Sequence, residues 1–264
     1  MKKIIFFLIV ILIVPIILFF NNAKQNNNKD EWDVISEKIN YFKKQNINRY
    51  KKYKKDNPNK SNSQIVIDVN IGLDNPFYTN TKPANNFDTD YVLVNKYNYL
   101  NKDYVPNNLT KIDSTRLLNH VTHAFIEMKN AAKKDNLSIV AISGYRSYSY
   151  QDNIYKKYAR ADGISKADTY SARAGFSEHQ TGLAVDISNG KLPYTQFEDT
   201  KEFEWMIKNA YKYGFILRYP KDKEKITGYM YESWHYRYVG TDISAYIQKN
   251  NITYDEYYVM FIDK

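Results

Sequence analysis

The hydrophobic pattern of the chain begins with an apolar run over residues 4–20, preceded by Lys2 and Lys3 and broken only by Pro15. Seventeen residues lie at the short end of the range that can span a membrane. The two lysines hold the start of such a segment in the cytoplasm. Residues 21–23 form a poor cleavage site, so the pattern favours an uncleaved signal anchor over a cleaved secretory signal. We therefore expect a single-pass membrane protein whose folded part lies outside the cytoplasm.

Residues 21–63 are polar and rich in asparagine and lysine, and they carry one weak helical stripe. Of the formal net charge of +9, most lies here, because residues 21–60 hold eleven basic and five acidic side chains. We interpret this segment as a basic stalk, either a solvated spacer or a contact for anionic lipids or wall polymers. Nucleic-acid binding is excluded, because the charge lies outside the folded part and on the wrong side of the membrane.

From residue 64 to residue 264 the pattern is that of one globular domain. A short apolar run over 64–72 predicts a strand, and Ser114 is placed to cap a helix with Val121, Phe125 and Met128 on one face. Further strands are expected over 183–187, 215–219 and 234–238, and further helices over 150–162, 202–213 and the last residues of the chain. Because these elements alternate irregularly with several hairpin-length links, we predict an α+β fold with a largely antiparallel sheet.

The candidate chemistry starts at SEHQTGLAVD, where His179 precedes Asp186 by seven residues. On one continuous strand these side chains would face opposite sides, but a turn at Thr181-Gly182 lets them meet. A carboxylate inside an apolar strand is costly to bury unless it is paired or bound to a metal. The pair is therefore either a metal site or a core histidine with an aspartate partner. Glu178 is expected to point away from this site, because neighbours along an extended chain face opposite sides.

A second motif, ESWH, supplies Glu232 and His235. Two histidines and one carboxylate make a common catalytic zinc set with one open position, and the remaining carboxylate can serve as general base. The chain has no cysteine, so thiolate ligands, a thiol nucleophile and disulfides are excluded. A rival set, His120 and His123 with Glu127, lies on the predicted helix and lacks a distant partner, so ordinary helix packing or surface exposure is the favoured interpretation of these residues.

Three segments, SEHQTGLAVD, SGYRSYSYQ and ESWHYRYVG, resemble in order and spacing the motifs of VanY-type D-alanyl-D-alanine carboxypeptidases. These zinc peptidases belong to a superfamily with lysostaphin-like enzymes and the hedgehog signalling domain. The resemblance covers residues 64–264 and implies a small central, mainly antiparallel sheet flanked by helices. One departure is Ser233, where the family often has proline between the glutamate and the tryptophan.

The resemblance implies a zinc carboxypeptidase that removes the terminal D-alanine from peptidoglycan stem peptides at the bacterial cell surface. An L,D-carboxypeptidase acting on tetrapeptide stems, an endopeptidase that cuts cross-links and a non-catalytic wall-binding module of the same fold stay open. Arg146 is expected to hold either the substrate carboxylate or the developing oxyanion. The implied roles are metal binding for His179, Asp186 and His235, catalysis for Glu232 and Arg146, and substrate binding for Tyr145, Arg146, Gln151 and Ser177.

Overall fold

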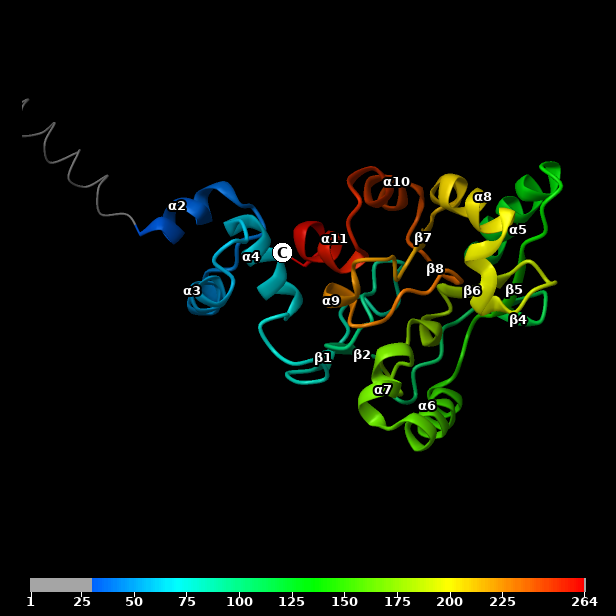
Figure 1. The fold of residues 1–264 in the computed structure, drawn as a ribbon, viewed down its shortest axis with the longest axis horizontal. Coiled ribbons are helices and arrows are strands. Elements are labelled where there is room, and N and C mark those ends of the chain that lie inside the picture. The colour runs from blue at the N-terminus through cyan, green and yellow to red at the C-terminus, as the bar shows by residue number, and fades with distance from the viewer. Residues whose placement is uncertain (1–29, 264) are drawn as a thin grey trace, which may run out of the picture. The chain divides into compact units, whose positions relative to one another are not determined.

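The computed structural model describes residues 30–263, and contacts between Cα atoms divide the chain into a unit up to Val66 and a unit from Ile67 onward (Figure 1). The helices are α2 (Glu31–Lys38), α3 (Ile47–Asp56), α4 (Asn62–Ile71), α5 (Asn119–Lys134), α6 (Tyr148–Asp162), α7 (Ile164–Tyr170), α8 (Lys201–Asn209), α9 (Glu224–Thr227), α10 (Thr241–Asn250) and α11 (Tyr254–Phe261). Short 3-10 helices are η1 (Lys44–Asn46), η2 (Glu178–Thr181), η3 (Tyr194–Asp199) and η4 (Ala210–Tyr213). The strands are β1 (Lys82–Pro83), β2 (Asn98–Tyr99), β3 (Leu109–Ile112), β4 (Thr115–Leu118), β5 (Val140–Ser143), β6 (Ala184–Ser188), β7 (Phe215–Leu217) and β8 (His235–Tyr238).

The predicted membrane localisation needs correction. Its signal anchor, residues 4–20, lies outside the described residues. Within residues 30–263, no helix is both long and apolar enough to cross a membrane. A span needs about 20 predominantly apolar residues, whereas α5 has 16 residues, several of them charged. This finding overturns the predicted single-pass localisation.

In the unit up to Val66, α2 and α3 meet through an aromatic cluster. The ring of the fully buried Tyr50 stacks on Trp32 at 5.7 Å and lies 4.9 Å from Phe42 between centroids. Such contacts stabilise short helices that would be marginal alone. Residues 31–56 therefore contain more helix than we predicted for the stalk, where the sequence showed only one weak helical stripe. The boundaries 1–20, 21–63 and 64–264 stay a prediction.

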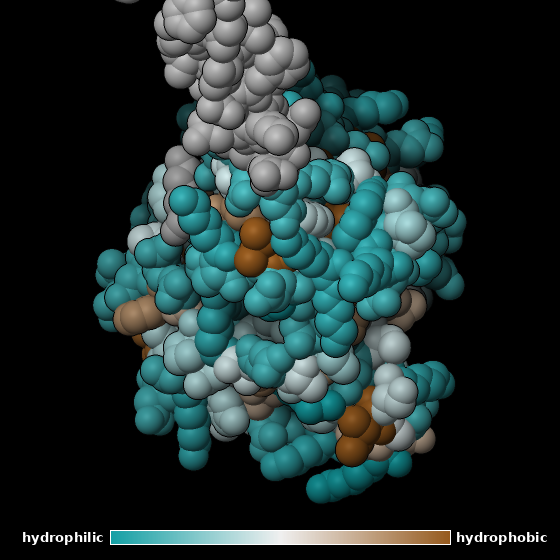
Figure 2. All heavy atoms as spheres, turned by 90° about the vertical axis from the view of Figure 1, so that its left-hand side faces the viewer, coloured by the Kyte–Doolittle hydropathy of each residue, from teal (hydrophilic) through white to brown (hydrophobic). Residues whose placement is uncertain are grey.

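The surface in Figure 2 is mostly hydrophilic, and hydrophobic residues form only separate spots on it. This agrees with the one quarter of the residues that are charged. No observation on residues 30–63 supports the predicted contact with anionic lipids or wall polymers.

The apolar run over residues 64–72 forms most of helix α4 and not the predicted strand. Its hydrophobic residues are buried in every direction around the helix axis, including Ile65, Val66 and Val69, which have no exposed surface. A short, uniformly apolar run has the same pattern in a buried strand and in a buried helix. The period of the pattern could therefore not distinguish the two.

A four-stranded sheet in the order β5-β6-β8-β7 forms the centre of the unit from Ile67 onward, and all its pairs are antiparallel. This confirms the predicted α+β class with a small antiparallel sheet. In its register, Asp186 of β6 lies opposite His235 of β8 on one side and Ser143 of β5 on the other. The register therefore places two of the candidate ligands next to each other.

The helix expected to start at Ser114 begins at Asn119, so this boundary was wrong. Residues 115–118 instead pair with residues 109–112 as the antiparallel hairpin β3-β4. In the hairpin, the backbone N–H and C=O groups of residues 115–118 pair with the neighbouring strand and not within a first helical turn. The rest of the predicted face is confirmed, because Val121, Phe125 and Met128 are fully buried on α5.

The hydrophobic core lies on one face of the sheet. Val185 and Ile187 of β6 belong to it, together with side chains of α5 and α8. Because side chains alternate along a strand, Asp186 between them points to the opposite face. In Figure 1, α5, α8 and α10 are drawn on one side of the sheet and α6 and α7 on the other. The face that carries Asp186 is thus the one toward α6.

Candidate metal centre

Two histidines and one aspartate from three different elements form a buried cluster. His179 lies in η2, Asp186 in β6, and His235 is the first residue of β8. Oδ1 of Asp186 is 3.3 Å from Nε2 of His179 and 3.1 Å from Nδ1 of His235. Within the described residues, these three form the group whose possible ligand atoms all lie within 4.8 Å of one another.

The expected turn between His179 and Asp186 is present. Gly182 ends η2 with φ +73°, in the left-handed region that favours glycine. A Cβ at this position would also approach Cδ2 of Leu109 to 3.0 Å. The turn reverses the chain before β6, so that a histidine from a 3-10 helix and an aspartate from a strand reach the same point.

Neighbouring groups orient His179 and Asp186. Nδ1 of His179 donates a hydrogen bond to the carbonyl oxygen of Gly144 at 2.7 Å, which leaves Nε2 as the acceptor that faces the cluster. Burial and the charge of Arg146 lower the pKa of His179 to about 4, so its imidazole is neutral near pH 7. Oδ2 of Asp186 accepts from Nη2 of Arg146 at 3.0 Å. Each residue thus directs one remaining atom into the cluster.

The donor set fits a tetrahedral zinc ion. Nε2 of His179 and Oδ1 of Asp186 are buried and have no hydrogen-bond partner among the described residues. Zinc bonds of about 2.0–2.1 Å in a tetrahedron place neighbouring ligand atoms about 3.3 Å apart. The observed separations from Asp186 Oδ1, 3.3 and 3.1 Å, are close to this value. Three protein ligands also leave the fourth position open for water or substrate, as in catalytic zinc sites.

The ionisable groups of the cluster shift one another's pKa values. Burial opposes a charge on His235, but contacts with Asp186 and Glu178 outweigh it and raise the pKa of His235 to about 9. Burial likewise opposes a charge on Asp186, yet His179, His235 and Arg146 hold the pKa of its carboxyl well below the ordinary value. The charge on His235 is therefore stabilised by the two carboxylates on either side of its ring, and the charge on Asp186 by the cationic groups around it.

Glu232 lies beside the ligand cluster and outside it. Its Oε2 is 3.6 Å from Nδ1 of His235, three residues further along the chain, and the side chain is buried. Burial raises the pKa of Glu232 to about 7, with Asp186 adding to the effect and His235 and Arg146 opposing it. A carboxyl group with this pKa can both accept and return a proton near neutral pH.

The cluster opens into a cleft of about 600 Å³ between α6 and the segment before β8. Of the predicted substrate-binding residues, Arg146, Gln151 and Ser177 line it. Nη1 of Arg146 donates to Oε1 of Gln151 at 3.0 Å, and the Nε of Arg146 has no partner among the described residues. A guanidinium has five N–H donors, so the hydrogen bonds to Gln151 and Asp186 leave further N–H groups of Nη1 and Nη2, on a side chain that is 19% exposed, for an anionic group in the cleft.

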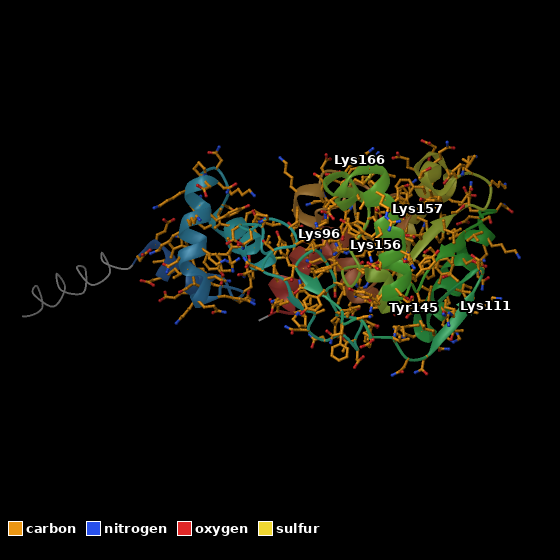
Figure 3. The ribbon with its side chains drawn as sticks, turned by 90° about the horizontal axis from the view of Figure 1, so that it is seen from below. Lys96, Lys111, Tyr145, Lys156, Lys157 and Lys166 are labelled. Carbon is orange, nitrogen blue, oxygen red and sulfur yellow. The ribbon has the colours of Figure 1, made fainter. Side chains whose placement is uncertain are left out.

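Tyr145 is not among the residues that line this cleft. Its ring lies against the guanidinium of Arg116, 5.6 Å from the centroid, and Arg116 pairs with Lys111 across the β3-β4 hairpin. Figure 3 shows Tyr145 on the side of the molecule that carries Lys111. The structure therefore does not bring Tyr145 to the site where the sequence places it.

The aromatic residues that line the cleft were not identified from the sequence. Tyr194 and Trp234 meet edge to face with centroids 5.1 Å apart, and Tyr150 and Tyr158 project from α6. Trp234 lies within the ESWH motif, so it could have been found there. The tyrosines gave no usable signal, because the chain contains 26 of them.

The rival set does not form a metal site in the structure. Nε2 of His120 lies 2.8 Å from Oδ1 of Asp90, and His120 is half exposed. Within residues 30–263, neither His120 nor His123 belongs to a group with metal-ligand spacing. The surface interpretation of these two histidines agrees with this arrangement.

Comparison with known proteins adds a family match. The family model described as VanY, D-alanyl-D-alanine carboxypeptidase, matches residues 114–241, a range that contains every candidate ligand. Among curated proteins, the putative carboxypeptidase YodJ of Bacillus subtilis is 38% identical over 218 residues, which cover 75% of this chain and 79% of that protein.

Two solved structures are also similar. One is that of the LD-carboxypeptidase LdcB, with 39% identity and a TM-score of 0.64 over 69% of this chain and 91% of that one. The other is the vancomycin-resistance D,D-pentapeptidase VanY of a VanB-type cassette in complex with Zn(II), with 32% identity and a TM-score of 0.57. That match covers 64% of this chain and 98% of the other.

Proposed function

The chain belongs to the VanY family of D-alanyl-D-alanine carboxypeptidases, and we propose that it is a zinc-dependent enzyme that removes the terminal D-alanine from peptidoglycan stem peptides. The observation that carries the proposal is the cluster itself. His179, Asp186 and His235 each direct a ligand atom to one point, and Glu232 lies beside them. The Zn(II) complex of the similar VanY structure supports the choice of metal.

In this proposal the three ligands hold zinc, which supplies a Lewis acid for the peptide carbonyl and lowers the pKa of the attacking water. Glu232 accepts the proton of that water at its carboxylate and later returns it to the departing amine of D-alanine. The raised pKa of Glu232, about 7, suits both transfers. Burial of the site strengthens each of these charge interactions.

Arg146 is proposed to meet the anionic groups of the substrate. Its Nη1 and Nη2 each donate one hydrogen bond, to Gln151 and Asp186, which fixes its orientation, and each of these nitrogens has a second N–H group. Two roles fit this position: holding the terminal carboxylate of the peptide, or stabilising the oxyanion as it develops. The cleft of about 600 Å³ leaves room for the remainder of a stem peptide along its aromatic walls.

The second candidate is an L,D-carboxypeptidase that acts on tetrapeptide stems. The observation that favours it is the match to LdcB, a structure with 39% identity of which this chain covers 91%. The two activities differ in the configuration of the residue before the scissile bond. A cross-link endopeptidase or a wall-binding module would need no terminal D-alanine to be released.

One experiment separates these functions. The full chain is incubated with pentapeptide stems and with tetrapeptide stems, each with and without a chelator, and released D-alanine is measured. We expect release from the pentapeptide that stops when the chelator is present and returns with added zinc. Release from the tetrapeptide alone would establish the L,D activity, and no release from either stem would overturn both assignments.

A further inference from the structure

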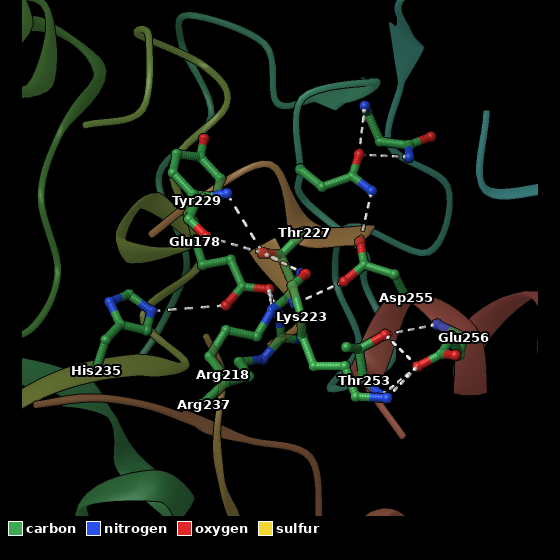
Figure 4. Close-up of polar contacts among 12 residues, drawn as sticks. Glu178, Arg218, Lys223, Thr227, Tyr229, His235, Arg237, Thr253, Asp255 and Glu256 are labelled. Atoms are coloured by element: carbon green, nitrogen blue, oxygen red, sulfur yellow. Dashed lines mark hydrogen bonds and ion pairs between the residues drawn. The ribbon is translucent and has the colours of Figure 1, made fainter. Parts of the chain in front are cut away.

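Glu178 precedes the candidate ligand His179, but its carboxylate reaches the imidazole of another ligand, His235 (Figure 4). It lies on the Nε2 side of this ring, whereas Asp186 lies on the Nδ1 side. Oε1 of Glu178 accepts hydrogen bonds from Nε of Arg218 and Nη1 of Arg237, both at 2.9 Å. All three side chains are buried. From the sequence, we expected Glu178 to point away from the metal site on the assumption of an extended chain, whereas the residue begins the 3-10 helix η2.

The two arginines hold this carboxylate in one position. Nη1 of Arg218 also donates to Oδ2 of Asp255 in α11 at 2.6 Å, and Nη2 of Arg237 donates to the carbonyl oxygens of Asp90 and Val92. Buried charges that are paired and hydrogen-bonded on several sides cannot move without leaving a partner unsatisfied. Glu178 is thus a fixed anion beside the candidate metal centre.

The second oxygen of Glu178 faces the imidazole of His235. Oε2 lies 3.7 Å from Nε2 of His235, slightly beyond hydrogen-bond length. Both atoms are buried, and neither has a hydrogen-bond partner among the described residues. The two atoms are a donor and an acceptor of matching chemistry, and a small rotation of the ring would bring them within hydrogen-bond length.

The contact between Glu178 and His235 matters because it can determine which nitrogen of the His235 imidazole carries the proton. A neutral imidazole carries a proton on one nitrogen, and only the other nitrogen can bind a metal. In His179 the carbonyl of Gly144 fixes the proton on Nδ1. In His235 the nitrogen toward Asp186 is Nδ1, so the proton must lie on Nε2, the atom that faces Glu178.

We propose that Glu178 is a positioning residue that keeps the proton of His235 on Nε2 and so presents Nδ1 to the metal. The inference rests on the proposed function only in requiring that zinc binds at this site. A carboxylate behind a histidine ligand orients the ring and strengthens it as a ligand, and removing such a partner weakens metal binding by about 10–100-fold.

The variant Glu178→Gln tests the role with little change in shape. Its single oxygen replaces Oε1 between the two arginines, which leaves the amide NH2 group toward Nε2 of His235. Two hydrogen-bond donors then face each other whenever Nδ1 of His235 binds zinc. Asp255→Asn is the matched control, because it removes a carboxylate from the same arginine cluster but does not contact His235.

The zinc dissociation constant of the full chain is measured by competition with a chelator, and circular dichroism verifies folding. We expect Glu178→Gln to bind zinc about 10–100-fold more weakly than wild type, and Asp255→Asn to bind it as wild type does. Equal zinc binding by wild type and Glu178→Gln, or an equal loss in both variants, would overturn the proposed role. A wild-type chain that binds no zinc would instead refute the proposed function.

A measurement on the wild type alone covers the case in which Glu178→Gln does not fold. In the zinc-loaded protein with 15N-labelled histidine, the Nε2 proton of His235 should give a downfield NMR signal that exchanges slowly with water, because it is hydrogen-bonded to a buried carboxylate. A rapidly exchanging proton at this nitrogen, or none, would overturn the inference.

Discussion

Asp186 and His235 are cross-strand neighbours in β6 and β8, and Oδ1 of the aspartate lies 3.1 Å from Nδ1 of the histidine. They are 49 residues apart in the sequence, so only the register of the sheet brings them together. Because both backbones are fixed by ladder hydrogen bonds, this edge of the proposed metal site is preorganised. His179 completes the site from a turn and not from a strand.

The metal assignment is tested by replacing His179, Asp186 and His235 with alanine one at a time. Each variant keeps only two protein ligands, so we expect zinc content and D-alanine release to fall together. Zinc is measured by atomic absorption after gel filtration. His120→Ala and His123→Ala are the controls, since these histidines lie outside the cluster. Full zinc occupancy in the three ligand variants would refute the assignment.

The second prediction concerns the general base. In Glu232→Gln, a carboxamide of the same shape cannot accept a proton, so kcat should fall by at least about a hundredfold. Zinc content should be unchanged, because Glu232 is not one of the three ligands. Glu224→Gln, which alters an exposed glutamate in α9, is the matched control. Near-normal turnover by Glu232→Gln would exclude this residue from the proposed mechanism.

Arg146→Ala should lower kcat/KM by at least about a hundredfold, the cost of removing one preorganised donor. The kinetic constants then show which anion Arg146 meets. A rise in KM indicates the substrate carboxylate, and a fall in kcat with little change in KM indicates the oxyanion. Arg160→Ala, at an exposed position near the end of α6, is the control. Unchanged kcat/KM in Arg146→Ala would remove this residue from the site.

Zinc content must be measured in the same Arg146 variant. Arg146 donates to Oδ2 of Asp186, so its loss could act through the ligand and not through the substrate. An Arg146→Ala enzyme with full zinc content and low activity supports direct contact with substrate. Loss of zinc would show that Arg146 acts by orienting Asp186.

The last prediction concerns stability and Lys96, whose position is labelled in Figure 3. Its Nζ donates to the carbonyl oxygens of Asp168 and Gly228 and lies 4.4 Å from the ring centroid of Tyr229, one wall of the cleft. Burial lowers the pKa of Lys96 from its ordinary value of 10.5 to about 8. Between these values the unfolded chain binds more protons than the folded one, so this lysine makes stability rise with pH.

Urea unfolding of wild type and Lys96→Met is compared across this pH range. The difference in unfolding free energy, wild type minus variant, should increase from about pH 8 to about pH 10. Lys157→Met, at an exposed position on α6, controls for the loss of one positive charge. A difference that stays constant or decreases over the range would contradict the lowered pKa of Lys96.

The sequence alone predicted those features of the protein that depend on short stretches of the chain. The three motifs with their fixed order led to His179, Asp186, His235 and Glu232, and the structure brings these four side chains together. The antiparallel class followed from irregular alternation and hairpin-length links. The amphipathic face of α5 followed from its period, although the hairpin before it moved the start of the helix to Asn119.

Other features needed the tertiary structure, because they depend on contacts between distant residues. The apolar pattern of residues 64–72 suits a buried strand and a buried helix equally, and only packing produced α4. Tyr145 belongs to a recognised motif, yet the bend after β5 turns it toward Arg116 and away from the cleft. The contact of Glu178 with His235 arises because Arg218 and Arg237, 40 and 59 residues further along the chain, draw its carboxylate behind the ring. Spacing along a sequence predicts on which face of a helix or strand a residue lies. The residue that it contacts on that face depends on strand register and on the pairing of buried charges.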